Sequence, residues 1–196
     1  MFTALLDTNV LWPSLQRDFF LSLAVEGTFR PVWSEAILSE LSASEENKLI
    51  ARHQKTPREA HARAFKLVDT MRRMFPDALI QNWEWRDGSY GLPDRNDEHV
   101  VAAAETADAK AIVTENLKDF PAHLIPSTIA VVSARTFAFH AVSVSTHRAH
   151  LAINEIAKRS GSRGPVMTHD HILDRLEKAY GFTDAVGVLR DTRPAP

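Results

Sequence analysis

Short apolar runs alternate along this chain with longer segments in which apolar residues recur at helical spacing. The runs Phe2–Leu6, Ala111–Thr114 and Ile129–Val132 are typical of strands covered on both faces. The segments Pro13–Val25 and Asp97–Ala107 instead place apolar residues three or four positions apart, as helices do. This β-α-β alternation predicts an α/β fold of three layers, α/β/α, with a parallel central sheet.

Local signals place the other elements of the first part of the chain. An extended segment, Phe29–Trp33, leads to Ser34, which is a suitable N-cap for a following helix. Residues 56–59 form a capping box with proline at the first helical position, so a further helix is expected up to about Phe75. The run Leu79–Trp83 is predicted to be a strand.

The strand pattern stops after Ser133. Three helices are predicted beyond it, at Ser145–Arg159, Thr168–Tyr180 and Asp184–Leu189. The first two are separated by Ser160–Pro165, a segment rich in turn-forming residues. We therefore predict an α/β domain over residues 1–134 and a helical C-terminal appendage over residues 135–196.

Polar residues follow the predicted strands where an open α/β sheet binds its ligands. Asp7 comes directly after the first strand, and Glu115-Asn116 follow the strand that ends at Thr114. Glu40 lies on the helix after Ser34, and Asp94 and Asp97 occupy a loop just before another helix. Because the carboxyl ends of parallel strands meet at one edge, these groups are expected to gather there.

Carboxylates gathered at one place indicate a cation site. Like charges a few ångströms apart raise each other's pKa unless a cation neutralises them. Aspartate, glutamate and asparagine supply only oxygen ligands, which favours Mg²⁺ or Mn²⁺ over zinc. Such an ion lowers the pKa of a bound water and stabilises the oxygens of a phosphodiester during in-line attack. The predicted chemistry is therefore metal-dependent hydrolysis of a phosphodiester.

Composition narrows the class of protein further. Hydrophobic residues make up 44% of the 196 residues, so a packed core is expected. Cysteine is absent, which excludes disulfides and thiolate metal sites and favours a reducing compartment. We see neither a signal peptide nor an apolar run long enough to cross a membrane, so a cytoplasmic protein is expected.

Charge is unevenly distributed although the net charge is only −2. Residues 1–134 hold 14 Lys and Arg against 19 Asp and Glu, whereas residues 135–196 hold 9 against 6. Within the first part, the predicted helix after residue 56 is basic. A basic surface beside an acidic metal site suits a polyanionic substrate, and a solvated helix face is the alternative explanation. The phosphate-binding candidates are Arg58, Arg63, Lys66, Arg72 and Arg73.

Four sequence blocks resemble, in order and spacing, the signature blocks of PIN-domain ribonucleases, and especially the VapC-like toxins of toxin–antitoxin pairs. They are LLDTNVLW (5–12), ILSEL (37–41), LPDRNDEHVVAAA (92–104) and AIVTENLKDF (111–120). The resemblance implies a PIN-like fold and a metal-dependent endoribonuclease. It also implies two partners, an RNA substrate and a cognate antitoxin protein, and a homodimer is a third candidate assembly.

The same resemblance assigns roles to individual residues. Asp7 matches the first acidic ligand and Glu40 the second. Asp97 best matches the third, with Asp94 as a close competitor, so both are candidate catalytic residues. The fourth position falls on Asn116, where many PIN nucleases carry aspartate. The implied metal ligands are Asp7, Glu40, Asp97 and Asn116, and the asparagine leaves a second metal site in question.

Other interpretations compete with this one. Asp7 as the cap of the helix near Pro13 is disfavoured because the gap is too long, whereas Asp97 could be both an N-cap and a ligand. His169-Asp170-His171 and Trp85 are expected to be structural, not a metal clip or a base-stacking surface. A non-catalytic RNA- or protein-binding module on a PIN scaffold is the main functional alternative. A structure-specific DNA nuclease is disfavoured because the expected helical arch and extra acids are absent.

Overall fold

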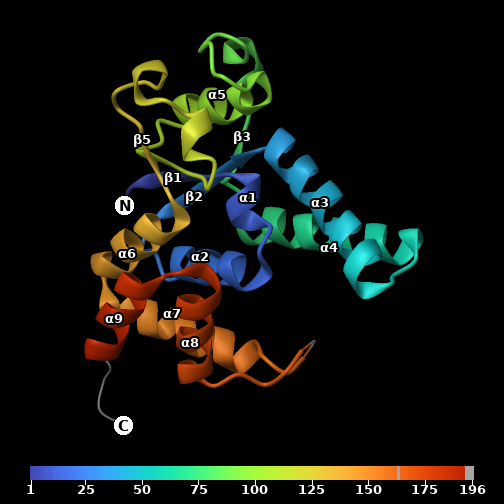
Figure 1. Cartoon of the computed structure of the whole chain (residues 1–196), viewed down its shortest axis with the longest axis vertical. Helices are drawn as coiled ribbons and strands as arrows, with labels where there is room; N and C mark the ends of the chain where they lie inside the picture. Colours follow the sequence, from blue (N-terminus) through green and yellow to red (C-terminus); the bar gives the residue numbers. More distant parts are fainter. Residues whose placement is uncertain (163, 193–196) are drawn as a thin grey trace. The chain divides into compact units, whose positions relative to one another are not determined.

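A sheet of five parallel strands organises the first part of the chain (Figure 1). The computed structural model describes residues 1–162 and 164–192. The strands occur in the spatial order β3-β2-β1-β4-β5. They are β1 (Thr3–Leu6), β2 (Arg30–Ser34), β3 (Leu79–Ile80), β4 (Ala111–Val113) and β5 (Ala130–Val132). Helices flank this sheet, and further helices follow β5, so the predicted α/β class with a parallel sheet and a C-terminal helical segment is confirmed.

The register of β1 and β4 positions the candidate site. Leu6 pairs with Val113, and the Asp7 amide donates to the Val113 carbonyl at 3.1 Å. Asp7 and Thr114, the next residues on the two strands, therefore emerge side by side. The strand order reverses between β1 and β4, which makes this the switch point where open α/β sheets bind ligands.

The described residues divide into two compact units. The sheet unit contains Phe2–Trp12 and Pro31–Val132. The helical unit contains Met1, Pro13–Arg30 and the described residues from Ser133 onward. The segment Pro13–Arg30 thus belongs by packing with the C-terminal helices, while the domain boundary after residue 134 stays a prediction.

Helices in the sheet unit begin where the sequence signals predict. They are α1 (Thr8–Leu11), α3 (Glu35–His53), α4 (Pro57–Met74) and α5 (Glu98–Thr106). The Ser34 hydroxyl accepts from the Ile37 amide and caps α3, and Thr56 and Glu59 form the predicted capping box of α4. Small alanines on one face of α4 let it pack closely along α3, and the two helices run side by side in Figure 1.

Aromatic side chains form the core of the helical unit. Phe29 meets Phe137 edge-on at 4.8 Å between ring centroids, and Phe20 contacts Phe137 at 5.5 Å and Phe182 at 5.7 Å. Phe19 completes the cluster at 6.0 Å from Phe182. These rings join the helices α2 (Ser14–Val25), α6 (Ala134–Val144), α7 (Thr146–Arg159), α8 (His169–Tyr180) and α9 (Thr183–Asp191).

Three details differ from the sequence prediction. The four-residue helix α1 was not expected, because one turn is too short to show helical periodicity. Helix α6 was missed as well, since alanines supply much of its buried face and give a weak apolar signal. Strand β3 ends at Ile80 and does not reach Trp83, because Asn82 adopts a left-handed backbone conformation with φ of 60°.

The predicted breaker between α7 and α8 is present as turns and bends over its described residues, and Arg163 within it lies outside them. Among the described residues, no helix combines the length and the apolar character that crossing a bilayer requires.

Candidate active site at the carboxyl end of the sheet

Asp7 is the most enclosed carboxylate of the site, with 4% of its surface exposed. Its Oδ1 accepts from the Thr8 amide at 2.6 Å, so Asp7 is the N-cap of α1. Asp7 does not cap the helix near Pro13, as predicted, because Pro13 is the N-cap residue of α2; it caps instead the unexpected helix α1, which begins directly after it. Burial raises the pKa of Asp7, and the negative charge of Glu40 adds to the rise, against the hydrogen bonds from Thr114 and Thr8.

The second oxygen of Asp7 is held by two neutral side chains. Asp7 Oδ2 accepts from Asn9 Nδ2 at 2.6 Å and from Thr114 Oγ1 at 2.7 Å. Thr114 is fully buried, and its hydroxyl also accepts from Asn9 Nδ2 at 3.0 Å and from the Asn116 amide at 3.1 Å. Asn9 in turn accepts from the Glu115 amide at 3.0 Å. The network fixes the direction of the Asp7 carboxylate without neutralising its charge.

Sequence analysis did not identify Thr114 as a site residue. Thr8 and Asn9, which follow Asp7 directly in the chain, both donate to its carboxylate. Thr114 lies more than a hundred residues further along the chain, and only the pairing of β1 with β4 brings its hydroxyl to Asp7. The sequence did offer one signal, because Thr114 is a polar residue at the end of an apolar strand and stands directly before the acidic residue Glu115.

Glu40 is tied to the start of α1 and to α5. Thr8 Oγ1 donates to Glu40 Oε2 at 2.6 Å, and His99 Nε2 lies 3.1 Å from Glu40 Oε1. Burial alone would raise the pKa of Glu40, but the hydrogen bonds from His99 and Thr8 and the charge of His99 lower it. Burial opposes protonation of His99, but its hydrogen bond to Glu40 and the charges of Glu40 and Asp7 raise its pKa.

Asp97 lies among three other carboxylates. It is half-buried, and burial raises its pKa to about 6, with further contributions from the charges of Asp7, Asp94 and Asp119. Asp97 occupies the N-cap position of α5, as anticipated, but its side chain makes no cap hydrogen bond to that helix. The Asp94 side chain instead accepts from the Asn96 amide at 2.9 Å and caps the short turn at Arg95–Asp97.

A buried glutamate braces the loop that carries Asp94 and Asp97. Glu98 is 3% exposed, and its Oε1 accepts from the amides of Gly91 at 2.8 Å and Leu92 at 3.0 Å. Its Oε2 accepts from the Tyr90 amide at 3.0 Å. Burial alone would raise the pKa of Glu98, but these three amides outweigh burial and lower it. Glu98 is a supporting residue that sequence analysis passed over as part of the helix start.

Most of the predicted site residues therefore lie close together, but they differ in how directly they interact. Asp7, Asp97, Asp94 and Asp119 lie close enough for their charges to interact, and Glu40 joins them through Thr8. Asn116 is linked through its backbone amide to Thr114, while its side chain is exposed. The choice between Asp94 and Asp97 as third ligand, like the other roles, stays a prediction.

The donor chemistry fits a hard divalent cation. Four mutually repelling carboxylates are stabilised by a cation, and all the assigned donors are oxygens. Among the described residues, no three His, Asp or Glu side chains converge into a complete metal-binding group as they stand. Asp7, Glu40 and Asp97 are the carboxylates that would hold such an ion, and Mg²⁺ in proteins commonly keeps several water ligands as well.

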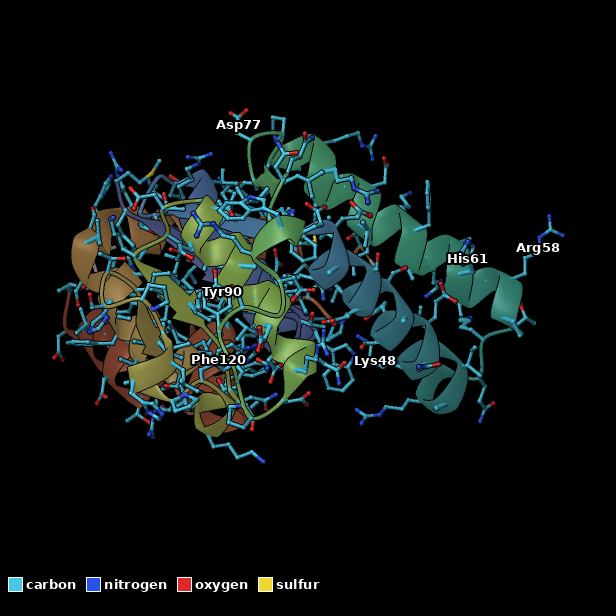
Figure 2. All side chains as sticks on the ribbon, turned by 90° about the horizontal axis from the view of Figure 1, so that it is seen from above. Lys48, Arg58, His61, Asp77, Tyr90 and Phe120 are labelled. Carbon is cyan, nitrogen blue, oxygen red and sulfur yellow. The ribbon has the colours of Figure 1, made fainter. Side chains whose placement is uncertain are left out.

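The basic residues of α4 fall into two groups. Arg72 pairs with Glu35 of α3, and Arg73 pairs with Asp69 at 3.0 Å. Arg58, Arg63 and Lys66 are exposed and form no ion pair among the described residues. In Figure 2, Arg58 extends into solvent from the end of α4 that lies farthest from the sheet.

Two histidines of the helical unit contact each other. His150 and His169 stack with their ring centroids 5.4 Å apart, and His150 Nδ1 lies 3.2 Å from His169 Nε2. Thr168 caps α8, because its hydroxyl accepts from the His171 amide at 3.3 Å.

Comparison with known proteins agrees with this geometry. No curated protein and no solved structure gives a match. A protein-family model described as the PIN domain matches residues 3–118, which is more than half of the chain. PIN domains are generally metal-dependent nucleases, and the matched segment spans the described sheet edge from Asp7 to Asn116. A parallel sheet with acidic residues at its switch point and this family match lead to one conclusion: the chain belongs to the PIN domain family.

Proposed function

We propose that this protein is a metal-dependent endoribonuclease and the toxin of a toxin–antitoxin pair. The observation that carries the proposal is the gathering of four carboxylates, in which the charges of Asp7, Asp94 and Asp119 add to the effect of burial in raising the pKa of Asp97 to about 6. Such repulsion is unfavourable in an apo protein and becomes useful once a cation is bound, so it supports a functional over a structural cluster.

Each side chain has a distinct part in the proposed reaction. Asp7, Glu40, Asp97 and Asn116 would hold Mg²⁺ or Mn²⁺, which supplies charge neutralisation at the phosphate and a more acidic bound water. Asn9 and Thr114 keep the Asp7 carboxylate in one orientation, and Thr8 does the same for Glu40. Asp94 is exposed at the rim of the cluster, where it can orient a water for attack.

The choice of RNA as substrate rests on the resemblance of the four sequence blocks to VapC-like ribonucleases and on the basic helix α4. Arg58, Arg63 and Lys66 are exposed without ion pairs among the described residues, so they are available to phosphates. Electrostatic contacts of this kind strengthen the binding of a polyanion regardless of its sequence.

The toxin role rests on the same resemblance. A cognate antitoxin would be the protein partner, a second copy of the chain the other candidate partner, and the cytoplasm the site of action. Inducing the wild-type chain in a bacterial host should arrest growth, whereas inducing Asp7→Asn should not. Growth arrest by both chains would contradict a nuclease toxin.

A cleavage assay tests the enzymatic proposal. Wild-type protein with Mg²⁺ or Mn²⁺ should cut a fluorescein-labelled single-stranded RNA internally, and EDTA should stop the reaction. Asp7→Asn should lose more than about 100-fold in rate, since even residues that only support metal ligands cost ~10–100-fold. Asp77→Asn is the matched control, because Asp77 is an exposed carboxylate outside the cluster.

One observation favours the second candidate function, a non-catalytic RNA-binding module. Asn116 supplies a neutral side chain at the position where the resemblance expects an acid, which weakens the fourth donor. Binding of RNA by wild-type protein without cleavage in either metal would select this alternative over the nuclease.

A further inference from the structure

A tryptophan stands exposed on the turn that precedes the acidic loop. Trp85 has 72% of its surface exposed, whereas its neighbour Trp83 has 8%. The expectation that Trp85 packs into the protein is therefore wrong. A large aromatic ring on the surface forgoes the stabilisation of burial, and such rings commonly mark interaction sites.

The ring of Trp85 is held in place by an arginine. The guanidinium of Arg86 lies 4.2 Å from the centre of the Trp85 ring. Arg86 is itself fixed, because its Nη1 pairs with Glu105 Oε2 at 2.8 Å. The hydroxyl of Tyr90 donates to the same oxygen at 2.6 Å. Trp85 and Arg86 therefore form a flat, fixed surface on a turn that α5 supports.

The same turn is connected to the acidic cluster. Trp83 packs against the ring of His99, with 5.9 Å between centroids, and His99 contacts Glu40 at 3.1 Å. The turn Glu84–Arg86 lies against α5 in the segment drawn between β3 and α5 in Figure 1. The exposed ring thus belongs to the structural scaffold that carries the proposed catalytic residues.

An acidic site creates a specific difficulty for a nucleic acid substrate. The carboxylates of Asp7, Asp94, Asp97 and Asp119 repel a phosphate until a cation neutralises them. Stacking of a base on an aromatic ring does not depend on phosphate charge, so it can anchor a substrate where electrostatic contacts cannot. Every base presents a flat face, which makes this anchor tolerant of sequence.

We propose that Trp85 and Arg86 form a stacking platform for an unpaired base of the RNA substrate, on the turn that packs against α5. This inference rests on the proposed function. The exposed ring receives the base, and the guanidinium of Arg86, fixed by Glu105, holds the ring in place. A base within a duplex is already stacked on its neighbours, so the platform selects single-stranded RNA.

Binding measured without cleavage tests the platform. Fluorescein-labelled oligouridine and a matched abasic ribose-phosphate oligomer are titrated with the full chain in EDTA, and the anisotropy is followed. Trp85→Ala should weaken oligouridine binding roughly 5- to 100-fold, as expected for the loss of one stacked base. Trp85→Phe should retain most of the affinity. Phe139→Ala, which removes an exposed aromatic ring from α6, should leave it unchanged.

Two further readouts separate stacking from a general loss of structure or charge. The abasic oligomer should bind wild type and Trp85→Ala equally, and the dependence of oligouridine affinity on salt should keep its slope in Trp85→Ala. Equal oligouridine affinity of wild type and Trp85→Ala would overturn the platform and leave the ring to a protein partner. Equal weakening of abasic binding would overturn it as well.

The proposed function and the platform fail in different ways. A wild-type protein that binds oligouridine through Trp85 but never cleaves RNA would refute the nuclease and keep the platform. A wild-type protein that cleaves RNA, with the KM of Trp85→Ala unchanged, would refute the platform and keep the nuclease.

Discussion

The orientation of the carboxylates in this site depends on individual neutral side chains that bond to them. The hydroxyl of Thr114 is the clearest case, because it donates to Asp7 and accepts from Asn9 and the Asn116 amide while fully buried. Its removal takes one donor from the buried Asp7 carboxylate and the acceptor from the Asn116 amide, and a buried carboxylate that loses a donor costs more than the bond itself gains.

Replacing Thr114 by valine keeps the shape of the side chain and removes these bonds. We expect Thr114→Val to lower the free energy of unfolding by about 1–3 kcal/mol and RNA cleavage by ~10–100-fold. Urea denaturation and the cleavage assay measure the two effects. Thr114→Ser keeps the hydroxyl and should recover most of both, so equal behaviour of the two variants would contradict this role.

The raised pKa of Asp97 leads us to expect that the stability of the folded protein changes with pH. Because burial and the charges of Asp7, Asp94 and Asp119 raise it to about 6, the folded protein holds this proton more tightly than the unfolded chain does. The associated stability is present at low pH and is lost as the pH rises from about 4 to about 6.

Asp97→Asn removes this dependence. In EDTA near neutral pH, the variant should be more stable than wild type by about 1–2 kcal/mol, after allowance for solvent screening of a half-exposed carboxylate. The difference should shrink as the pH falls towards about 4 and vanish at about pH 3, where wild-type Asp97 is protonated in both states. Urea titrations across this range measure it, and a gain of equal size at both ends would refute the prediction.

At the scale of elements, the loop before α5 depends on one carboxylate. Glu98 accepts three backbone amides from Tyr90, Gly91 and Leu92. In Glu98→Gln, one oxygen becomes an amide group that cannot accept, so we expect a loss of about 1–3 kcal/mol. Hydrogen exchange should rise first at these three amides. Glu84→Gln, in the preceding turn, is the control, and unchanged protection in Glu98→Gln would show that the loop needs no brace.

The basic residues of helix α4 lead us to expect that RNA binding weakens as the salt concentration rises. Arg58, Arg63 and Lys66 are without ion pairs among the described residues, whereas Arg72 and Arg73 are paired with Glu35 and Asp69. Changing the first three to glutamine should weaken single-stranded RNA binding and lower the slope of log affinity against log salt by ~0.7 for each lost phosphate contact.

The paired arginines provide the control for this prediction. Arg72→Gln combined with Arg73→Gln should change the slope less than the triple variant, because part of their charge is already compensated. An unchanged slope in the triple variant would reassign this face of α4 to solvent or to a protein partner.

At the scale of the whole molecule, the C-terminal helices complete a core that begins near the N-terminus. Phe137 of α6 and the residue Phe182 cover Phe20 of α2, and Phe182 also contacts Phe19. Ending the chain after Ser133 would expose these rings of α2, each worth about 1.5–3 kcal/mol when buried. We expect the truncated chain to aggregate or unfold, as gel filtration and circular dichroism would show. A monomer that melts like the full chain would contradict this packing.

Much of the architecture follows from local chemistry along the chain. The apolar runs at β1, β4 and β5, the cap at Ser34 and the capping box at Thr56 all act within a few residues, so their effects are visible in one segment. The α/β class and the parallel sheet were predictable for that reason. The acidic residues at strand ends were visible too, because strand periodicity shows where each strand stops.

Only the tertiary structure decided what those residues do for one another. The bond from Thr114 to Asp7 depends on the β1–β4 register, and the joining of Glu40 to Thr8 and His99 depends on how α3 and α5 pack. The exposure of Trp85 beside the buried Trp83 likewise depends on a turn that Asn82 creates. Sequence determined the elements because their energies are local, whereas contacts between distant segments arise from packing that no single segment contains.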